Sequence, residues 1–310
     1  MSNKKNIDKN VVAIIGGAGF LGSRLATRFK KKNISSKKYD IDLSNCLDES
    51  IYLDVEDIDS LDQLSCVSTI INLAAIHSDD VRPSSRYDDV NVQGAKNVCE
   101  AACKHGVNKI IFTSTVAIYG FAPADTDESG EYNYFNDYGR TKYLAEQVYK
   151  AWQLEDPINR SLVIVRPTVI FGEGNRGNVY NLLRQIASHR FMMFGDGKNK
   201  KSMAYVENVV AFIEYSLSLE QGLHIYNYID KPDFDMNTLI LDVKKILFGK
   251  AHIGLRLPNF VGIALGYVAD LVAMIIRKPL PISSIRVKKF LGTSQFASSV
   301  KETEFVPPFS

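Results

Sequence analysis

Short apolar runs alternate with stretches of helical apolar periodicity through the first half of the chain. The runs VVAII, STIINLAA, NKIIFTST and RSLVIVRP are rich in β-branched residues, as buried parallel strands are, and a further strand ends near Asp40. Helical periodicity extends to about Phe29 and again over 92–106 and 137–153. This alternation predicts right-handed βαβ units in an α/β fold, a Rossmann-type doubly wound parallel sheet.

The domain organisation follows from where the alternation ends. We assign residues 1–172 to a dinucleotide-binding domain, to which 203–230 return. Residues 173–202 and 231–310 are expected to form a smaller, mostly helical substrate lobe. The cleft between the two parts would lie outside the carboxyl ends of the strands.

One late segment, FVGIALGYVADLVAMII at 260–276, is far more apolar than its surroundings. It carries a single charge, Asp270, and Arg277 and Lys278 follow it. As a helix it is about 26 Å long, against about 30 Å for a hydrocarbon core. Its polar and small positions form one narrow stripe, namely Asn259, Gly262, Gly266, Asp270 and Arg277. Three interpretations stay open: a helix buried between lobes or in a homodimer, a helix lying in a membrane interface, and a membrane span.

Composition and charge exclude little but are informative about partners. Hydrophobic residues make up 45% of the chain, and the net charge is +2, which gives no reason to expect nucleic-acid binding. The cysteines at 46, 66, 99 and 103 form no CxxC pair and no cluster with histidine, so no metal site is expected. The polar N-terminus lacks the apolar stretch of a signal peptide, and we expect a cytoplasmic protein.

A glycine-rich loop, GGAGFLG, joins the first strand to its helix. Gly16 would make the tight turn, Gly19 would let the backbone approach a pyrophosphate, and Gly22 would let helix and strand pack closely. Asp40 lies 18 residues after Gly22, where a carboxylate accepts both adenosine ribose hydroxyls and repels a 2′-phosphate. The sequence therefore predicts NAD rather than NADP, although Lys37 and Lys38 lie nearby as solvated lysines.

The motif DYGRTK places Tyr138 and Lys142 on one face of a helix at i and i+4. A phenol with a pKa of about 10 is a weak base, and a neighbouring ammonium lowers that pKa. Such a pair can remove a hydroxyl proton while hydride leaves the same carbon.

With these motifs the chain resembles the extended short-chain dehydrogenase/reductase family, the NAD-dependent sugar epimerases and dehydratases. The resemblance covers roughly 11–217 and includes GGAGFLG, LDV, NLAA, VNVQG, TSTVAIYG, YGRTK and RPTVIFG. It implies that Thr115, Tyr138 and Lys142 are catalytic. The implied cofactor contacts are Gly16, Gly19, Phe20, Leu21, Gly22, Asp40, Asp54, Val55, Leu73, Ala74, Ala75, Asn91, Thr113, Tyr138, Lys142 and Pro167. The implied substrate contacts are His77, Thr115, Asn178 and Lys201, and Asp79–Asp80 lie close to His77.

The chain departs from the family at two sites whose residues usually contact the pyrophosphate of a nucleotide. Val169 stands where R-x-x-N-x-x-G motifs have asparagine, and Lys201–Ser202 replace an Arg–Asp pair. In these features and in its C-terminal segment, the chain resembles bacterial 4-epimerases that act on N-acetylglucosamine linked through diphosphate to undecaprenol. A membrane-bound substrate would explain the apolar segment 260–276.

Four alternatives remain open: a soluble UDP-sugar 4-epimerase, a sugar-nucleotide dehydratase, a 4-keto reductase, and a non-catalytic NAD-binding regulator. Val116–Ala117 disfavour the dehydratase, which usually has Asp–Glu there. The intact trio of Thr115, Tyr138 and Lys142 disfavours the regulator.

Overall fold

The computed structural model describes residues 11–44, 50–78, 81–276, 278, 280 and 283–309. Cys46, the Asp79–Asp80 pair and Arg277 lie outside these ranges, and so does the N-terminal decapeptide.

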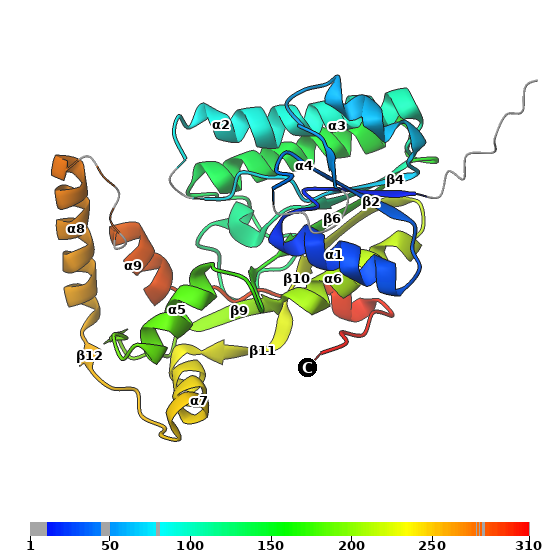
Figure 1. Ribbon diagram of the computed structural model, residues 1–310. Coiled ribbons are helices and arrows are strands. Elements are labelled where there is room, and N and C mark those ends of the chain that lie inside the picture. The colour runs from blue at the N-terminus through cyan, green and yellow to red at the C-terminus, as the bar shows by residue number, and fades with distance from the viewer. Residues whose placement is uncertain are drawn as a thin grey trace, which may run out of the picture.

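A seven-stranded, wholly parallel sheet forms the centre of the larger domain (Figure 1). In spatial order its strands are β10 (Gly222–Tyr228), β6 (Ser161–Pro167), β5 (Lys109–Thr113), β4 (Thr69–Asn72), β1 (Val12–Ile15), β2 (Ser36–Asp40) and β3 (Ser50–Tyr52). The central strands are buried on both faces, which is why they read as continuous apolar runs. The predicted Rossmann-type doubly wound sheet is confirmed.

Helices cover both faces of this sheet (Figure 1). One layer consists of η1 (Ser60–Cys66), α2 (Ser85–Tyr87), η2 (Asp88–Gln93), α3 (Gly94–His105) and α4 (Asp137–Glu155). The other layer consists of α1 (Phe20–Lys31), α6 (Val206–Tyr215), η4 (Ser216–Ser218) and η5 (Ser299–Glu302). The stripe of Gly22, Leu25 and Phe29 shows how helical spacing turns one face of α1 towards the strands.

The order in which strands are added to the sheet reverses between β1 and β4. From β1 the chain builds outward through β2 and β3 on one side, and β4, β5 and β6 then fill the other side. At such a switch point the loops after neighbouring strands diverge and leave a crevice outside the carboxyl ends of the strands. The glycine loop follows β1 and the NLAA loop follows β4, so both predicted cofactor loops lie at this crevice.

A smaller lobe follows β6. It contains a three-stranded sheet of β11 (Asp230–Asp235), β9 (Lys200–Tyr205) and β7 (Val169–Phe171), and a parallel pair of β8 (Met193–Phe194) and β12 (Arg256–Leu257). Its helices are α5 (Asn178–Ala187), α7 (Met236–Phe248), α8 (Asn259–Ile276) and α9 (Ser284–Leu291). Its own small core includes Ile186, Met193 and Ile240.

The final segment of the chain leaves this lobe, contrary to our assignment of 231–310. Val300 and Phe305 pack against the core between the sheet and α6. The backbone N–H of Phe309 donates to Asn208 Oδ1 at 3.0 Å, and Asn208 Nδ2 donates to the Phe309 carbonyl at 2.8 Å. Apolar side chains near the end of the chain thus return it to the larger domain.

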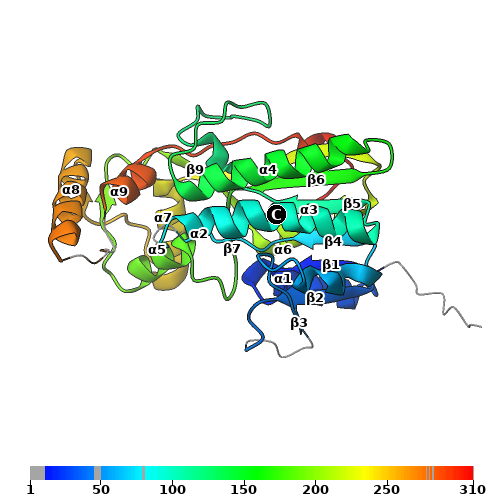
Figure 2. The same cartoon turned by 90° about the horizontal axis from the view of Figure 1, so that it is seen from above.

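Helix α8 lies at one edge of the molecule, with α9 between it and the remainder (Figures 1 and 2). It attaches through the predicted polar stripe. A Cβ on Gly262 would lie 2.8 Å from the Phe194 ring, and one on Gly266 would lie 2.7 Å from Ser284 Cα. Asp270 Oδ2 accepts from the Ser284 backbone N–H at 3.1 Å. Small residues therefore bring this face against its neighbours, and the apolar faces remain exposed.

Candidate active site

The glycine loop has the close contacts that its sequence predicts. Gly16 follows β1 with φ of +80°, and a Cβ there would lie 2.9 Å from the Ala74 backbone nitrogen. A Cβ on Gly22 would lie 2.2 Å from the Gly16 carbonyl oxygen. Gly19 begins α1 as its N-cap and offers no side-chain cap. No side chain caps the first backbone N–H groups of α1, which is the arrangement that binds a phosphate at a helix N-terminus.

Asp40 lies at the carboxyl end of β2, beside this loop. Its Oδ2 accepts from the Ala18 backbone N–H at 2.8 Å, and its Oδ1 accepts from the Asp42 backbone N–H at 3.1 Å. The glycine loop thus orients the carboxylate, which retains acceptor capacity for a ribose hydroxyl.

Two asparagines shape the loop after β4. Asn72 Oδ1 accepts from the Ala74 backbone N–H at 3.0 Å, while its Nδ2 donates to the Tyr149 hydroxyl at 2.7 Å. Asn91, which the resemblance assigns to the cofactor, grips both backbone groups of Ile76, at 2.9 Å and 3.1 Å. Its Nδ2 also donates to Thr141 Oγ1 at 2.9 Å. The hydrogen bonds of the Asn91 side chain that are seen here are therefore made to other residues of the protein.

The remaining predicted cofactor residues follow the strand ends. Leu73, Ala74 and Ala75 are half-buried after β4, Thr113 and Pro167 end β5 and β6, and Phe20 and Leu21 begin α1. Asp54 and Val55 come after β3, where Val55 contacts Gly94 at the start of α3.

Close packing brings the predicted proton-transfer residues to one loop and one helix start. Thr115 follows β5, is buried, and its Oγ1 accepts from the Ala117 backbone N–H at 3.1 Å. The first turn of α4 contains Tyr138 and packs directly on this loop, since a Cβ on Gly139 would lie 2.7 Å from the Ala117 carbonyl oxygen. Asn136 caps the helix by accepting from the Gly139 backbone N–H at 2.9 Å.

Lys142 is almost fully buried one turn further along α4. Its Nζ lies 4.1 Å from the centroid of the Phe112 ring, under the carboxyl end of β5. Burial lowers the pKa of Lys142 from 10.5 to about 7, and the negative charge of Glu146 only partly opposes this. Its ammonium donates no hydrogen bond to any residue in the ranges that the structure covers. A ribose hydroxyl or a phenolate at this position would give the Lys142 amine a hydrogen-bond partner, and a phenolate would favour its charged form.

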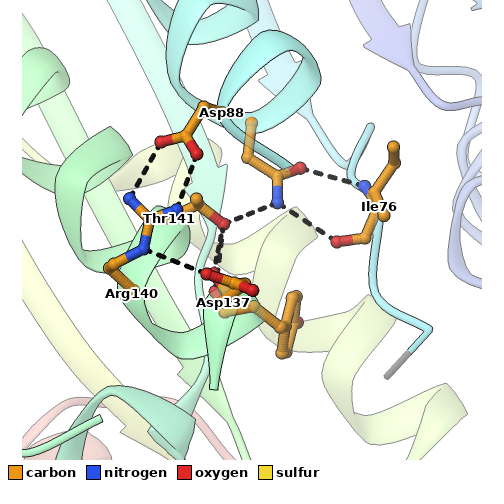
Figure 3. Close-up of polar contacts among 7 residues, drawn as sticks. Ile76, Asp88, Asp137, Arg140 and Thr141 are labelled. Carbon is orange, nitrogen blue, oxygen red and sulfur yellow. Dashed lines mark hydrogen bonds and ion pairs between the residues drawn. The ribbon is translucent and has the colours of Figure 1, made fainter. Parts of the chain in front are cut away.

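Two side chains between Tyr138 and Lys142 tie this turn to the neighbouring helix η2 (Figure 3). Arg140 forms a bidentate pair with Asp88, at 2.9 Å and 2.6 Å, and its Nε donates to Asp137 at 3.3 Å. The hydrogen bonds to Asp88 raise the pKa of Arg140, although burial opposes this. Thr141 links this turn to the loop after β4, because its Oγ1 accepts a hydrogen bond from Asn91 Nδ2. The turn that contains Tyr138 and Lys142 is therefore anchored on two sides.

A buried ion pair supports α4 from below. Arg166 Nε and Nη2 donate to the two oxygens of Glu146 at 2.9 Å and 2.6 Å, and both side chains are fully buried. Arg166 Nη1 also donates to the Tyr119 hydroxyl at 2.6 Å. Burial opposes the charge of Arg166, but the bonds to Glu146 outweigh it and raise the pKa of the guanidinium. This satisfied network connects β6, α4 and the loop after Thr115.

The residues at this edge fit a dinucleotide. Glycines leave most of the turn between β1 and α1 without side chains. The Lys142 ammonium has no hydrogen-bond acceptor among the described residues. The buried Thr113 Oγ1 also has no hydrogen-bond partner among the described residues. Both polar groups lie at the carboxyl end of β5, where the nicotinamide half of a cofactor spanning the crevice would be placed.

The predicted substrate residues lie on separate elements of the structure. His77 is exposed after the NLAA loop, and Asn178 is exposed as the first residue of α5. Lys201 has a different set of partners from the one we expected. Its Nζ donates to the carbonyl oxygens of Lys289, at 2.7 Å, and Gly292, where α9 ends. Burial lowers the pKa of Lys201 to about 8. Its role seen here is to cap α9 rather than to face a diphosphate.

The glycine loop, Asp40 and the Thr–Tyr–Lys set all lie in the part of the chain that matches a known protein family. A model of the NAD dependent epimerase/dehydratase family matches residues 12–228. The chain belongs to this family. NAD is therefore the cofactor, as Asp40 predicts, and the prediction of an NAD-dependent sugar 4-epimerase is confirmed by the relatives that follow.

The curated relatives separate by similarity. The chain is 48% identical over 304 residues to the N-acetyl-alpha-D-glucosaminyl-diphospho-ditrans,octacis-undecaprenol 4-epimerase of Escherichia coli O157:H7, which covers 96% of this chain and 91% of that protein. The UDP-glucose 4-epimerase of Vibrio cholerae is 26% identical over 216 residues, 65% of each chain. The UDP-glucose enzymes are therefore distant relatives.

Solved structures share the fold. The UDP-glucose 4-epimerase of Thermotoga maritima with UDP-glucose aligns with a TM-score of 0.69 at 23% identity, over 80% of this chain and 85% of that one. The UDP-glucuronic acid 4-epimerase of Bacillus cereus with NAD aligns with a TM-score of 0.68 at 20% identity, over 80% and 87%.

Sequence reasoning missed three supporting residues. Asp88, Arg140 and Glu146 hold helix α4. Asp88 and Glu146 belong to no motif that we recognised, and Arg140 lies within YGRTK but was assigned no role. Glu146 had one signal, since it continues the i, i+4 series of Tyr138 and Lys142. The partner of Arg140 lies 52 positions away, so no local pattern could reveal it.

Proposed function

We propose that this protein is an NAD-dependent 4-epimerase that interconverts N-acetylglucosamine and N-acetylgalactosamine while the sugar is carried by a polyprenyl diphosphate. The observation that carries the proposal is 48% identity, over nearly the full chain, to an enzyme named for that substrate. The set of Thr115, Tyr138 and Lys142 supports it because proton transfer at C4 needs these groups.

In the proposed reaction, NAD held by the glycine loop and Asp40 would supply the acceptor for the C4 hydride and the donor for its return. Tyr138 accepts the proton of the C4 hydroxyl as that hydride leaves, so C4 becomes a ketone. Thr115 holds the same oxygen by a hydrogen bond, its own oxygen being oriented by the Ala117 N–H. Lys142 stabilises the phenolate when protonated. After the 4-keto sugar presents its other face, Tyr138 gives the proton back and C4 is inverted.

We infer the carrier from two positions, Val169 and Lys201, at which the chain lacks the pyrophosphate contacts of nucleotide-sugar enzymes. Val169 supplies an apolar side chain on β7 where nucleotide-sugar enzymes place an amide, and it is partly exposed. The Lys201 ammonium is engaged by α9. At both positions the chain therefore differs from nucleotide-sugar enzymes, while the residues proposed for hydride chemistry are unchanged. A soluble UDP-sugar 4-epimerase is the second candidate, favoured by the likeness of fold to UDP-sugar enzymes.

A membrane-anchored substrate requires a cleft at the membrane surface, and α8 provides the contact that we propose. Among the described residues, α8 is a helix that is both long enough and apolar enough to cross a membrane, judged by length and composition. Its mean hydropathy is 1.9 and only 11% of it is buried, so the interpretation of a core helix fails for the single chain.

Basic residues lie beside the apolar surface of α8. Lys288 of α9 donates to the Tyr267 hydroxyl at 3.1 Å, and Arg286 and Lys278 are exposed close by. Cations next to an apolar helix match an anionic bilayer surface. Because one narrow face joins α8 to the body, we propose that the helix lies in the interface on the cytoplasmic side of the membrane. A homodimer through α8 is the competing arrangement.

The test of substrate is a side-by-side assay. Purified protein with NAD is offered UDP-N-acetylglucosamine and N-acetylglucosaminyl diphosphoundecaprenol, and the ratio of the two sugars is followed to equilibrium. We expect the lipid-linked sugar to be strongly preferred. Efficient turnover of the UDP-sugar with none of the lipid-linked sugar would establish the soluble epimerase instead.

The test of membrane contact uses two exposed positions on one face of α8. Val268→Glu with Ile275→Glu is expected to abolish binding to vesicles that contain anionic lipid, while NAD binding persists; these positions are more exposed than Ile263. Ile246→Glu on α7 is the control, because that side chain is even more exposed, at 82% against 57% and 70%, but lies on another helix. Loss of a dimer in the double variant, with vesicle binding unaffected, would assign α8 to a subunit interface.

A further inference from the structure

Four exposed aromatic side chains lie in the excursion between η3 (Val116–Tyr119) and α4, namely Phe121, Tyr132, Tyr134 and Phe135. We call the stacked pair of Phe121 and Phe135 the aromatic rim. Phe121 is 53% exposed, Tyr134 39% and Phe135 36%. The rings of Phe121 and Phe135 stack with centroids 5.0 Å apart. Soluble proteins seldom leave stacked phenyl rings in water without a binding role.

In the sequence, the two rim residues lie between Thr115 and Tyr138, each close to one of them. Phe121 lies two residues after the end of η3, whose N-cap is Thr115, and Phe135 precedes Tyr138 by three residues. The two ends of the excursion are held together, because the Asn133 N–H donates to the Ile118 carbonyl at 3.0 Å. A Cβ on Gly120 would lie 1.8 Å from the Asn133 carbonyl oxygen, so the backbones touch here. The position of the rim is therefore set by the same packing that places the catalytic pair.

The other side of the rim meets the smaller lobe. Lys289 Nζ of α9 lies 4.6 Å from the centroid of the Phe135 ring. Helix α9 in turn packs on α8, since Asp270 accepts from the Ser284 N–H and Gly266 makes room for Ser284. Figures 1 and 2 show α9 between α8 and the body of the molecule. Helix α9, which carries exposed Arg286 and Lys288, thus lies between the rim and the exposed apolar faces of α8.

We propose that the aromatic rim binds the first isoprene units of a polyprenyl chain as it leaves the cleft. This inference rests on the proposed function and names a determinant of its substrate. With the sugar C4 at Tyr138, the diphosphate and the start of the lipid must emerge within a short distance of the catalytic helix. Rigid phenyl rings bury isoprene methyl groups at low cost in side-chain entropy. The competing occupant of the rim is the bilayer itself, which the experiment distinguishes.

The experiment compares three diphosphate esters of N-acetylglucosamine, carrying ethanol, a two-isoprene prenol or undecaprenol, in one detergent. The variant is Phe121→Ser with Phe135→Ser. We expect wild type to gain in kcat/KM as soon as isoprene is present. The variant should lose about tenfold in kcat/KM on both prenyl esters, as expected from losing half-buried ring contacts, and nearly nothing on the ethyl ester. Phe121→Ser alone, at the more exposed ring, should give a smaller loss of the same pattern.

A matched control places the same change far from the site. Leu154→Ser with Ile158→Ser alters two highly exposed apolar side chains at and beyond the other end of α4 and should leave all three rates unchanged. Unchanged rates in the rim variant would overturn the inference, and so would an equal loss on the ethyl ester. Loss of vesicle binding without substrate would assign the rim to the bilayer. If wild type turns over no prenyl ester at all, the proposed function fails together with the inference.

Discussion

Burial of Lys142 carries a cost in stability that removal of its charge should reveal. The pKa of Lys142 falls from 10.5 to about 7 on folding. A tenfold change in proton affinity is about 1.4 kcal/mol, so the folded state bears a cost of about 5 kcal/mol at pH values where the lysine is protonated in both states. Replacement by methionine keeps most of the apolar stem and loses the cation–π contact with Phe112, worth about 1–2 kcal/mol. The NAD-free Lys142→Met variant should therefore be more stable than wild type by about 3 kcal/mol at pH 6, and inactive.

The pH dependence gives this prediction its sign. Between pH 7 and 10.5 the unfolded chain binds the proton that the folded Lys142 has released, so the free energy of unfolding of wild type rises with pH. The advantage of the variant is complete below pH 7 and should shrink by about 3 kcal/mol between pH 6 and pH 9.

Urea unfolding of NAD-free protein at both pH values measures this difference, with Lys96→Met on the exposed face of α3 as the control. The control should differ from wild type by the same small amount at both pH values. A Lys142→Met variant that is less stable than wild type at pH 6, or whose advantage does not change with pH, would refute the reasoning.

Three further predictions concern the chemistry of the site. Tyr138→Phe should abolish turnover while NAD stays bound, and Thr115→Val should slow turnover less, as measured by single-turnover rates and cofactor titration; a Tyr138→Phe enzyme that keeps most of its activity would exclude the assignment. Asp40 should make NAD bind far better than NADP, and Asp40→Ser should narrow that gap in a fluorescence titration; equal affinities in wild type would count against it. Arg140→Met should lower kcat several-fold with little change in KM, because the half-exposed pair itself contributes only about 0.5–1 kcal/mol but fixes the catalytic turn, and the charge-swapped Asp88→Arg with Arg140→Asp should recover part of the loss.

The sequence by itself determined the features that depend on local patterns. Continuous β-branched runs predict buried parallel strands because both faces of the sheet are covered. The glycine loop, Asp40 and the i, i+4 pair of Tyr138 and Lys142 were readable because each works within one turn or one strand–helix unit. The narrow polar stripe of the apolar helix was also readable, because helical periodicity places those positions on one side.

Only the tertiary structure decided which long-range partner each polar group meets. Lys201 reads as a phosphate ligand from its place in a motif, yet α9 approaches across 88 positions and its carbonyls take the ammonium. Asn91 holds the loop after β4 and the catalytic helix, again through residues far along the chain.

The same holds for the surface of α8. Periodicity alone could not tell a buried helix from an exposed one, because both are apolar nearly all round. The packing decided it, since glycines at 262 and 266 admit neighbours on one side and nothing in the described chain covers the others. Burial is a property of what the rest of the chain places nearby, and a sequence window does not contain that information.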